Sequence, residues 1–573
     1  MRPVEVDGYA LGGFAEAVAG LATRLEQATG TLVALPAHPD VAALAQPWAT
    51  RLALGRELLL TRLRSLARVV LLARRAYRTV EDEVAASFVG PARMAEPAVS
   101  ADNLLDLLGL ASADQLEALL VASPALAMVV VDEPGRPPGG SDADQLDALL
   151  AGGAAQVRVH EFLVGLDGDR LARLALLHPA LLCRVPSAPV AARCRAARVL
   201  VAADLDVLLT RRAALPVGSA RRQVDRQIAQ RREWLTGTVE VRDAQGRVVR
   251  RRHQLLDFSS KGDGQVVELL GDARRARHLA VFVPGTGSDL EREPGSVDRL
   301  LPFVRADPGL AVVLWQGADF PDQPFDDGFL PLRRHVLAAG YRDAADVAGP
   351  ALARDVAGLR LSMPQPADDL TVLGHSYGGS IVGAAQVHGL VADRVVHIAS
   401  AGAFVSHVAP GGTSAPRVFS MTAPDDPIQL AQGYGLRDAA SRWRAMSPRW
   451  LVPAAPVVGG AVHLVPDGSA IGHGLDPDRL PGVVRLDTGR FDDSCRLVRG
   501  HTGVFAPGTT AWRNLLATMD GGRVEVLEPS RWRTHLEPAG IRLGGGGAWL
   551  PRYVVDRTPW SDPTYRPPTL DVR

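Results

Sequence analysis

The sequence contains few cysteines, almost no lysine and no net charge, and each of these features excludes certain kinds of site or binding partner. Its three cysteines, Cys183, Cys194 and Cys495, are scattered over 573 residues, so they predict neither a disulfide framework nor a metal site. Lys261 is the only lysine, and 63 acidic residues balance 63 basic ones. Balanced and interspersed charges give no electrostatic footprint for nucleic acid or anionic lipid.

Long apolar runs are absent as well. No uninterrupted run reaches the roughly 18 residues of a membrane span, and residues 1–7 carry acids where a secretory signal would be apolar. We therefore expect no transmembrane segment and no classical signal peptide, and a cytoplasmic location unless another export route operates. The chain also lacks an H-E-x-x-H, a Walker loop and a dinucleotide fingerprint, which predicts no metal, nucleotide or redox cofactor.

Residues before 236 have the spacing of helices. Two apolar-periodic segments separated by prolines predict a helical hairpin domain over residues 1–100. Residues 101–236 are expected to form a helical region that packs on the next domain. Its predicted helices are 102–120, 142–150, 155–166, 167–177, 187–215 and 219–235. The arginine clusters at 221–222, 231–232 and 250–252 are expected on solvated helix faces or turns.

Residues 237–530 change to short apolar runs with helical segments between them. Residues 238–242 and 265–269 alternate like half-buried strands. Continuous runs at 279–283, 311–315, 370–373, 395–399, 418–421 and 483–486 are typical of strands buried on both faces of a parallel sheet. The predicted fold class is α/β, a mostly parallel sheet between helices, preceded by an all-α region. Residues 531–573 are expected to be an extended C-terminal tail.

The segment Gly374-His375-Ser376-Tyr377-Gly378 has the pattern of a nucleophile elbow. It follows the apolar run 370–373 and precedes a small-residue helical segment, 380–387. Glycines on both sides of a serine allow the sharp strand-to-helix turn that exposes its hydroxyl. A bare G-x-S-x-G also occurs in ordinary turns, but the strand before it and the helix after it favour Ser376 as a catalytic nucleophile.

An activated serine needs a histidine base and a carboxylate, which follow it in the order acid, then histidine. Asp425 and Asp426 both follow the run 418–421, and Asp426 is preferred because it directly precedes Pro-Ile, an argument by analogy. His463, His473 and His501 lie downstream. His501 is preferred because it follows the last apolar run, 483–486, whereas His473 is interpreted as structural or as a lip of the pocket.

Acyl transfer through a serine also needs two N–H donors for the oxyanion. One is expected from Tyr377, directly after the nucleophile. The other is expected from Thr286 in Pro284-Gly285-Thr286-Gly287-Ser288, the loop after the run 279–283. A simple glycine-rich turn is the alternative interpretation of that loop.

These segments together resemble an uncharacterised actinobacterial α/β-hydrolase family, a domain of unknown function. The similarity rests on residues 279–287, the elbow around Ser376, residues 423–428 and the segment from His501 to Thr509. It extends over about residues 160–520. The resemblance implies an α/β-hydrolase fold and a serine hydrolase, and it does not identify a substrate.

The first hairpin resembles helical domains exported by type VII secretion systems. Trp48 lies at the bend between the two predicted helices, and Tyr77 to Glu81 match Y-x-x-x-D/E. The resemblance implies export by a type VII-like system and a possible small helical partner. The alternative, which we favour, is an internal helical domain, because amphipathic helices usually pack into a core.

Three functions are compatible with these residues. The first is a serine esterase that cleaves a lipid or small acyl ester through an acyl-Ser376 intermediate, with Asp426 and His501. The second is an acyltransferase, in which an alcohol replaces water at the acyl-enzyme stage. The third is a non-catalytic interaction protein that uses the fold as a scaffold, which filled triad positions argue against.

Overall fold

The computed structural model describes ten stretches of the chain. They are residues 112–132, 141–243, 245–321, 343–404, 416–423, 426, 428, 473–494, 496–527 and 566–572, together with the backbone of four short strands between residues 534 and 555. The predicted hairpin of residues 1–100, with Trp48 and Tyr77, lies outside them. The chain divides into two compact units, residues 1–137 and 138–573.

The described part of the first unit consists of α4 (Ala113–Ala122) and α5 (Pro124–Asp132). Ser112 begins α4 with a capping box, since its hydroxyl accepts from Gln115 N–H and the Gln115 side chain accepts from Ser112 N–H. In the described residues, no single helix is long and apolar enough to cross a membrane. The pair Ala113–Ala122 and Pro124–Val131, bent by 110°, meets the length and composition test only when taken together.

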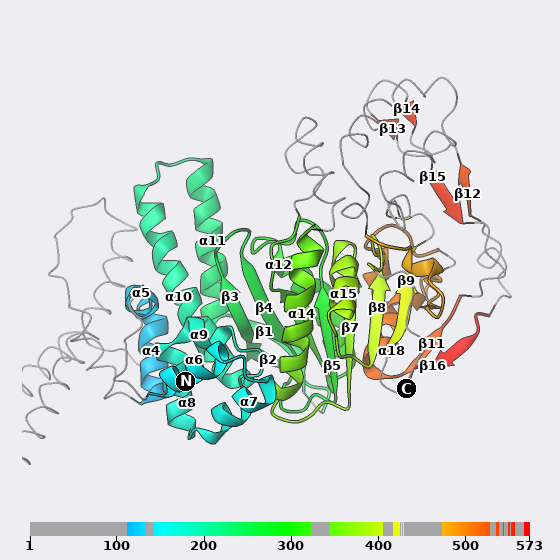
Figure 1. The fold of residues 1–573 in the computed structure, drawn as a ribbon. Helices are drawn as coiled ribbons and strands as arrows, with labels where there is room; N and C mark the ends of the chain where they lie inside the picture. The colour runs from blue at the N-terminus through cyan, green and yellow to red at the C-terminus, as the bar shows by residue number, and fades with distance from the viewer. Residues whose placement is uncertain are drawn as a thin grey trace, which may run out of the picture. The chain divides into compact units, whose positions relative to one another are not determined.

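The second unit begins with helices whose positions agree with the prediction. They are α6 (Asp142–Ala151), α7 (Gln156–Gly165), α8 (Gly168–Leu177), α10 (Val190–Ala214) and α11 (Ser219–Thr236). Ser141 and Asp167 cap α6 and α8 through their side-chain oxygens, as expected for N-cap residues. The short helix α9 (Pro179–Cys183) was not predicted. Helices α10 and α11 form a long antiparallel hairpin beside the sheet (Figure 1).

The main sheet has eight strands in the order β10-β9-β8-β7-β5-β6-β4-β3. Their bounds are β3 Leu255–Ser259, β4 Gln265–Leu270, β5 His278–Val283, β6 Leu310–Gln316, β7 Asp369–His375, β8 Arg394–Ile398, β9 Arg417–Met421 and β10 Val484–Arg485. The pairs β3-β4 and β4-β6 are antiparallel and all other pairs are parallel, so β4 alone runs opposite to the rest of the sheet. This is the α/β-hydrolase fold, so the predicted fold class is confirmed.

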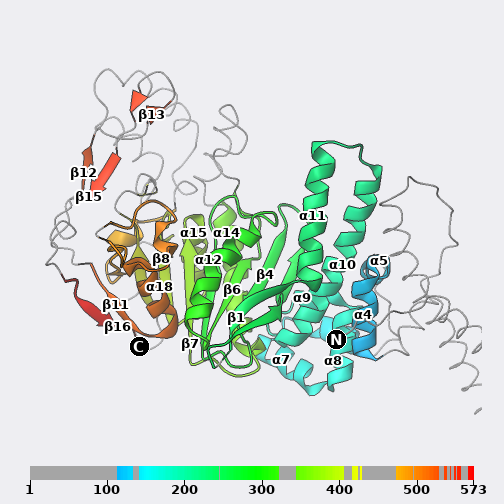
Figure 2. The same cartoon turned by 180° about the vertical axis from the view of Figure 1, so that it is seen from behind.

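Two apolar layers lie on opposite faces of the sheet. Along β5, Leu279, Val281 and Val283 belong to one cluster of buried side chains, whereas Ala280 and Phe282 belong to the other. The first layer contains α14 (Asp343–Ser362) and α15 (Tyr377–Val387), and the second contains α12 (Glu293–Ala306) and α18 (Thr510–Asp520). The strands are buried on both faces, which explains their continuous apolar runs, and Figures 1 and 2 show the helices on each side.

The helical hairpin is fixed to the β3 edge by buried arginines. Arg193 of α10 is 2% exposed and donates from Nε to the carbonyl of Leu256 in β3, at 3.1 Å. Arg231 of α11 is 3% exposed and pairs with Asp204 at 2.8 Å. The expectation that residues 231–232 lie on a solvated face is therefore wrong for Arg231, because its partner on α10 compensates the buried charge.

The arginine triplet 250–252 was also misplaced. It lies in β2 (Val248–Arg252), which pairs antiparallel with β1 (Thr238–Arg242), so it occupies neither a helix nor a turn. Arg250 lies opposite Glu240 and pairs with it at 3.2 Å. The alternating exposure of this strand accommodates arginines because every second side chain faces solvent.

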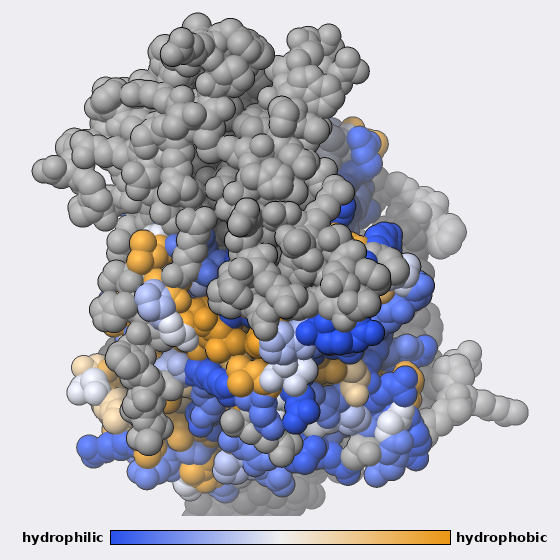
Figure 3. Space-filling view, turned by 90° about the vertical axis from the view of Figure 1, so that its right-hand side faces the viewer, coloured by the Kyte–Doolittle hydropathy of each residue, from blue (hydrophilic) through white to orange (hydrophobic). Residues whose placement is uncertain are grey.

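The far edge of the sheet is short. Strand β10 has two residues, and beside it β11 (Arg523–Glu525) pairs antiparallel with β16 (Thr569–Asp571). Val484, Val526 and Leu570 are only partly buried there. Figure 3, which views this side, shows hydrophobic surface among hydrophilic surroundings. The outer side of β10 is itself paired, because Leu527 N–H donates to Arg485 O and Asp487 N–H donates to Glu525 O, both at 2.9 Å, so this edge offers few unpaired backbone groups to another sheet.

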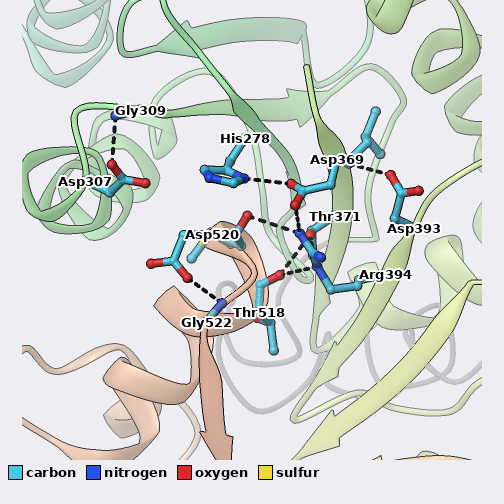
Figure 4. A network of polar contacts seen from close by, with 12 residues as sticks. His278, Asp307, Gly309, Asp369, Thr371, Asp393, Arg394, Thr518, Asp520 and Gly522 are labelled. Atoms are coloured by element: carbon cyan, nitrogen blue, oxygen red, sulfur yellow. Dashed lines mark hydrogen bonds and ion pairs between the residues drawn. The ribbon is translucent and has the colours of Figure 1, made fainter. Parts of the chain in front are cut away.

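A buried polar network joins α18 to the sheet (Figure 4). Asp369 of β7 contacts His278 Nδ1 at 3.0 Å and Arg394 Nη2 at 2.7 Å. Arg394 Nε also donates to the carbonyl oxygen of Thr518 at 2.6 Å, near the C-terminus of α18. A cation at the end of a helix satisfies carbonyls that lack a partner within the helix and interacts favourably with the helix dipole. The network therefore fixes α18 against β7 and β8.

This network should make stability depend on pH. The hydrogen bond with Asp369 raises the pKa of His278, although burial opposes the shift. Burial alone would raise the pKa of Asp369, but the hydrogen bonds from His278 and Arg394 outweigh it and lower that pKa. The His278 contribution is complete below its unfolded pKa of about 6.5 and is lost as pH rises through the folded value, while the Asp369 contribution is complete above about 3.9.

We therefore expect His278→Gln to lower the Tm most near pH 5.5, by the equivalent of roughly 1–2 kcal/mol, and least near pH 8.5. Thermal melts of wild type and variant at the two pH values measure the difference. The exposed His388→Gln is the matched control and should not change the Tm at either pH. A Tm loss for His278→Gln that is the same at both pH values would contradict the expected role of the charged histidine.

Candidate active site

Ser376 occupies a strained turn between β7 and α15. Its φ of 56° and ψ of −123° lie in a region that L-residues rarely adopt, as expected for a nucleophile elbow. The turn after β8 holds it in place, because Ser376 N–H donates to Ile398 O at 3.0 Å and Ser376 O accepts from Ala401 N–H at 3.1 Å. The strain is therefore balanced by hydrogen bonds on both sides of the serine.

Gly378 allows the helix after the serine to start where it does. A Cβ at this position would lie 2.3 Å from the carbonyl oxygens of both Val283 and Pro284, at the end of β5. Only glycine permits such a close approach of α15 to the neighbouring strand. The second glycine of the G-x-S-x-G pattern is thus required by backbone packing.

Asp426 and His501 are brought together although they are 75 residues apart in the sequence. His501 Nδ1 lies 2.9 Å from each carboxylate oxygen of Asp426, which is 1% exposed. An ionised carboxylate only accepts hydrogen bonds, so Nδ1 carries the proton and Nε2 is left with its lone pair. The Asp426 Oδ1 atom also accepts from Ile428 N–H at 2.9 Å, which fixes the carboxylate. This arrangement suits a general base.

His375, the residue before the nucleophile, links the elbow to His501. His375 Nε2 lies 3.1 Å from the carbonyl oxygen of His501, and the centroids of the two imidazole rings are 4.7 Å apart. No hydrogen bond joins Ser376 Oγ to the His501 ring among the described residues. Catalytic hydrogen bonds are often long before substrate binds, so the absence of this bond does not argue against Ser376 and His501 acting together.

His375 has a contact that its sequence position did not reveal. Burial lowers its pKa well below the usual histidine range, and the neighbouring His501 lowers it further. The ring is therefore neutral, and Nε2–H donates to the His501 carbonyl. It also meets the edge of Phe505, at 5.1 Å between ring centroids. Because the residue before the serine is variable in the G-x-S-x-G pattern, no sequence signal pointed to this role.

The loop after β5 lies directly against the nucleophile. A Cβ on Gly285 would be 2.7 Å from Ser376 Cβ and 3.2 Å from its Oγ. Thr286 follows Gly285, and Gly287 N–H is used elsewhere, donating to Pro321 O at 2.7 Å. Tyr377 is the first residue of α15. Of the two residues expected to supply oxyanion donors, Tyr377 thus directly follows Ser376 in the chain, and Thr286 directly follows Gly285, which lies against Ser376.

The remaining sequence candidates have different positions. Asp425 and His463 lie outside the described residues. His473 is 4% exposed, packs its ring at 5.1 Å against Tyr377, and accepts from Phe404 N–H at 2.7 Å through its backbone oxygen. Its place is beside the elbow and not in the pair with Asp426. Within the described residues, no group of three His, Cys, Asp or Glu side chains could hold a metal ion.

Sequence comparison finds a family match for part of the chain that contains Ser376. Residues 259–434 match the model of an alpha/beta hydrolase family. The uncharacterized proteins MT2140 and Rv2079, from two strains of Mycobacterium tuberculosis, are each 30% identical over 179 residues. The match covers 30% of this chain and only 26% of each relative. The chain therefore aligns with about a quarter of the length of these relatives.

Solved structures with weak similarity include two kinds of esterase. Esterase PE8 is 20% identical, with a TM-score of 0.21, over 28% of this chain and 75% of its own. Esterases from Rhizomucor miehei are represented by a structure 12% identical, with a TM-score of 0.23, over 55% of this chain and 93% of its own. Because these TM-scores are low, the assignment of the α/β-hydrolase fold is based on the strand order and on the family match.

Proposed function

We propose that the protein hydrolyses a carboxylic ester, of a lipid or a small acyl group, through an acyl-Ser376 intermediate. The observation that carries the proposal is the hydrogen bond between buried Asp426 and His501, together with a serine held in a strained elbow. Such a pair serves to activate a hydroxyl, which at its ordinary pKa is a poor nucleophile. The alpha/beta hydrolase family match of residues 259–434 supports the same reaction class.

In the proposed first step, His501 Nε2 takes the proton from Ser376 Oγ as the oxygen attacks the ester carbonyl. Asp426 keeps Nδ1 protonated and stabilises the imidazolium. The N–H groups of Tyr377 and Thr286 stabilise the oxyanion. The tetrahedral intermediate collapses, the C–O bond to the alcohol breaks, and His501 returns the proton to the leaving alkoxide. Water, deprotonated by His501, then releases the acid and regenerates Ser376.

Turnover of p-nitrophenyl esters from acetyl to dodecanoyl tests the proposal. We expect saturable release of p-nitrophenol and stoichiometric free acid, with a chain-length preference that identifies the acyl pocket. Adding glycerol as an alternative acceptor separates hydrolysis from acyl transfer, since a transferase would form glyceryl ester in place of acid. Absence of turnover with every ester, in protein shown to be folded by circular dichroism, would contradict an esterase.

A further inference from the structure

The loop that carries Thr286 is attached to the helical hairpin as well as to the sheet. Gln230 of α11 donates from Nε2 to the carbonyl oxygen of Leu290. Gln223 and Gln227 each donate from Nε2 to Glu291 Oε1 at 3.0 Å. The three glutamines are spaced four and three residues apart, so they lie on one face of α11. That face meets the segment joining β5 to α12.

Gln230 is oriented by the buried ion pair of the hairpin. Its Oε1 accepts from Arg231 Nη1 at 2.6 Å, while Arg231 Nε pairs with Asp204 at 2.8 Å. Arg231 also lies over the Trp234 ring, 4.9 Å from its centroid. Because the amide oxygen faces this cation, the amide nitrogen must face Leu290. The direction of the Gln230 N–H donor is therefore set within the helical hairpin, independently of the loop.

Only a few residues separate Leu290 from Gly285, the residue of this loop that lies against Ser376. Leu290 is 7% exposed and packs so closely on Gly264 that a Cβ there would lie 2.3 Å from it. Arg292 Nη1 donates to Gly287 O at 2.8 Å, and Ser288 Oγ donates to Gly285 O at 2.7 Å. A loop held at Leu290 and closed by these bonds has little freedom at Thr286.

We propose that Gln223, Gln227 and Gln230 are positioning residues that hold residues 284–292, the oxyanion loop, so that α11 is a working part of the catalytic site. This inference rests on the proposed ester hydrolysis. Oxyanion donors contribute because they are preorganised where charge develops, and displacing a reacting group by about 1 Å can cost roughly 100-fold in rate. Without the glutamines, the loop would keep its internal hydrogen bonds but lose its attachment to α11, and its position relative to Ser376 would be less fixed.

The kinetic test is a triple variant, Gln223→Leu with Gln227→Leu and Gln230→Met, which removes the three donors and keeps side chains of similar size. We expect kcat for a p-nitrophenyl ester to fall about 10- to 100-fold while KM changes less than about twofold. The pH at which kcat falls on the acidic side should not move, because His501 is untouched. A folded triple variant with wild-type kcat would overturn the inference.

Two matched variants separate positioning from general destabilisation. Arg226→Leu changes an exposed residue of the same helix and should leave kcat unchanged. Glu291→Gln keeps an oxygen that accepts from Gln223 and Gln227, so its kcat should stay close to wild type. If Arg226→Leu lowers kcat as much as the triple variant does, the effect comes from weakening α11 and the inference is wrong.

Hydrogen exchange of residues 284–292, followed by mass spectrometry, gives a readout that needs no activity. We expect faster exchange of this segment in the triple variant, with exchange of β7 and α15 unchanged. Unchanged exchange of the loop would overturn its attachment to α11. If wild-type protein fails to hydrolyse any ester while the loop still depends on the glutamines, the proposed function fails and the attachment stands.

Discussion

Ser376→Ala should reduce ester hydrolysis by about 10⁶-fold in kcat, to the background that binding and the oxyanion donors alone provide. The Ser376 hydroxyl oxygen is the atom that forms the acyl intermediate, and no oxygen of α15 lies at the strained elbow in its place. Steady-state rates with the preferred p-nitrophenyl ester measure the loss. The Tm should change little, because only one oxygen is removed from a small side chain.

A buried serine elsewhere gives the control for this result. Ser362 is 2% exposed, and its hydroxyl donates to Leu359 O at 2.9 Å, within α14. Ser362→Ala removes a hydroxyl of the same kind without touching the elbow, so kcat should stay at the wild-type value. Retention of more than a trace of hydrolysis by Ser376→Ala would show that another group is the nucleophile.

The second large effect is expected from Asp426→Asn, which should lower kcat by about 10⁴-fold. An amide can donate to Nδ1 of His501, and it then stabilises the tautomer whose Nε2 carries the proton and cannot accept one. The shape of the side chain is kept, so KM for the ester should change much less than kcat. Rates measured with both variants of the Asp425-Asp426 pair decide which carboxylate is the acid.

Asp425→Asn is the matched variant because it changes the neighbouring carboxylate in the same way. We expect it to keep nearly all activity, whereas Asp426→Asn loses it. The reverse pattern would assign the acid to Asp425 and would conflict with the 2.9 Å contacts between Asp426 and His501.

The parallel strands and the elbow could be predicted because their signals are local. Strands β5 to β9 are continuous apolar runs, since both of their faces are buried, and the elbow has glycines where backbone segments approach closely. The strands β2 and β3 were missed because they carry a weaker pattern. Three arginines occupy the exposed hairpin strand β2, and in β3 Asp257 interrupts the apolar run, so the sequence shows neither strict alternation nor a continuous apolar stretch.

The contacts within the site could be predicted only in part. Chain order selected Asp426 and His501, which the structure joins by a hydrogen bond, because acid and base follow successive strands at one edge of the sheet. The contact of His375 with the His501 backbone depends on how two distant loops meet. The three glutamines of α11 gave a helical spacing, but nothing local indicated that their face meets the oxyanion loop.

The burial of Arg231 shows the same limit. An arginine pair on a polar helix predicts a solvated face, and that holds for exposed Arg232. Arg231 is buried because α10 supplies Asp204 and because Trp234 and Phe258 lie beneath the guanidinium. A partner on another helix is a tertiary property, and a run of charges in one segment does not reveal it.

The most direct test of an activated nucleophile is to treat the folded wild-type protein with a fluorophosphonate and to locate the adduct by peptide mass spectrometry. The account predicts one phosphonyl group per chain, on the peptide that contains Ser376, with slow labelling of Asp426→Asn and none of Ser376→Ala. A folded wild-type protein that stays unlabelled, or that carries the adduct on a different serine, would contradict it.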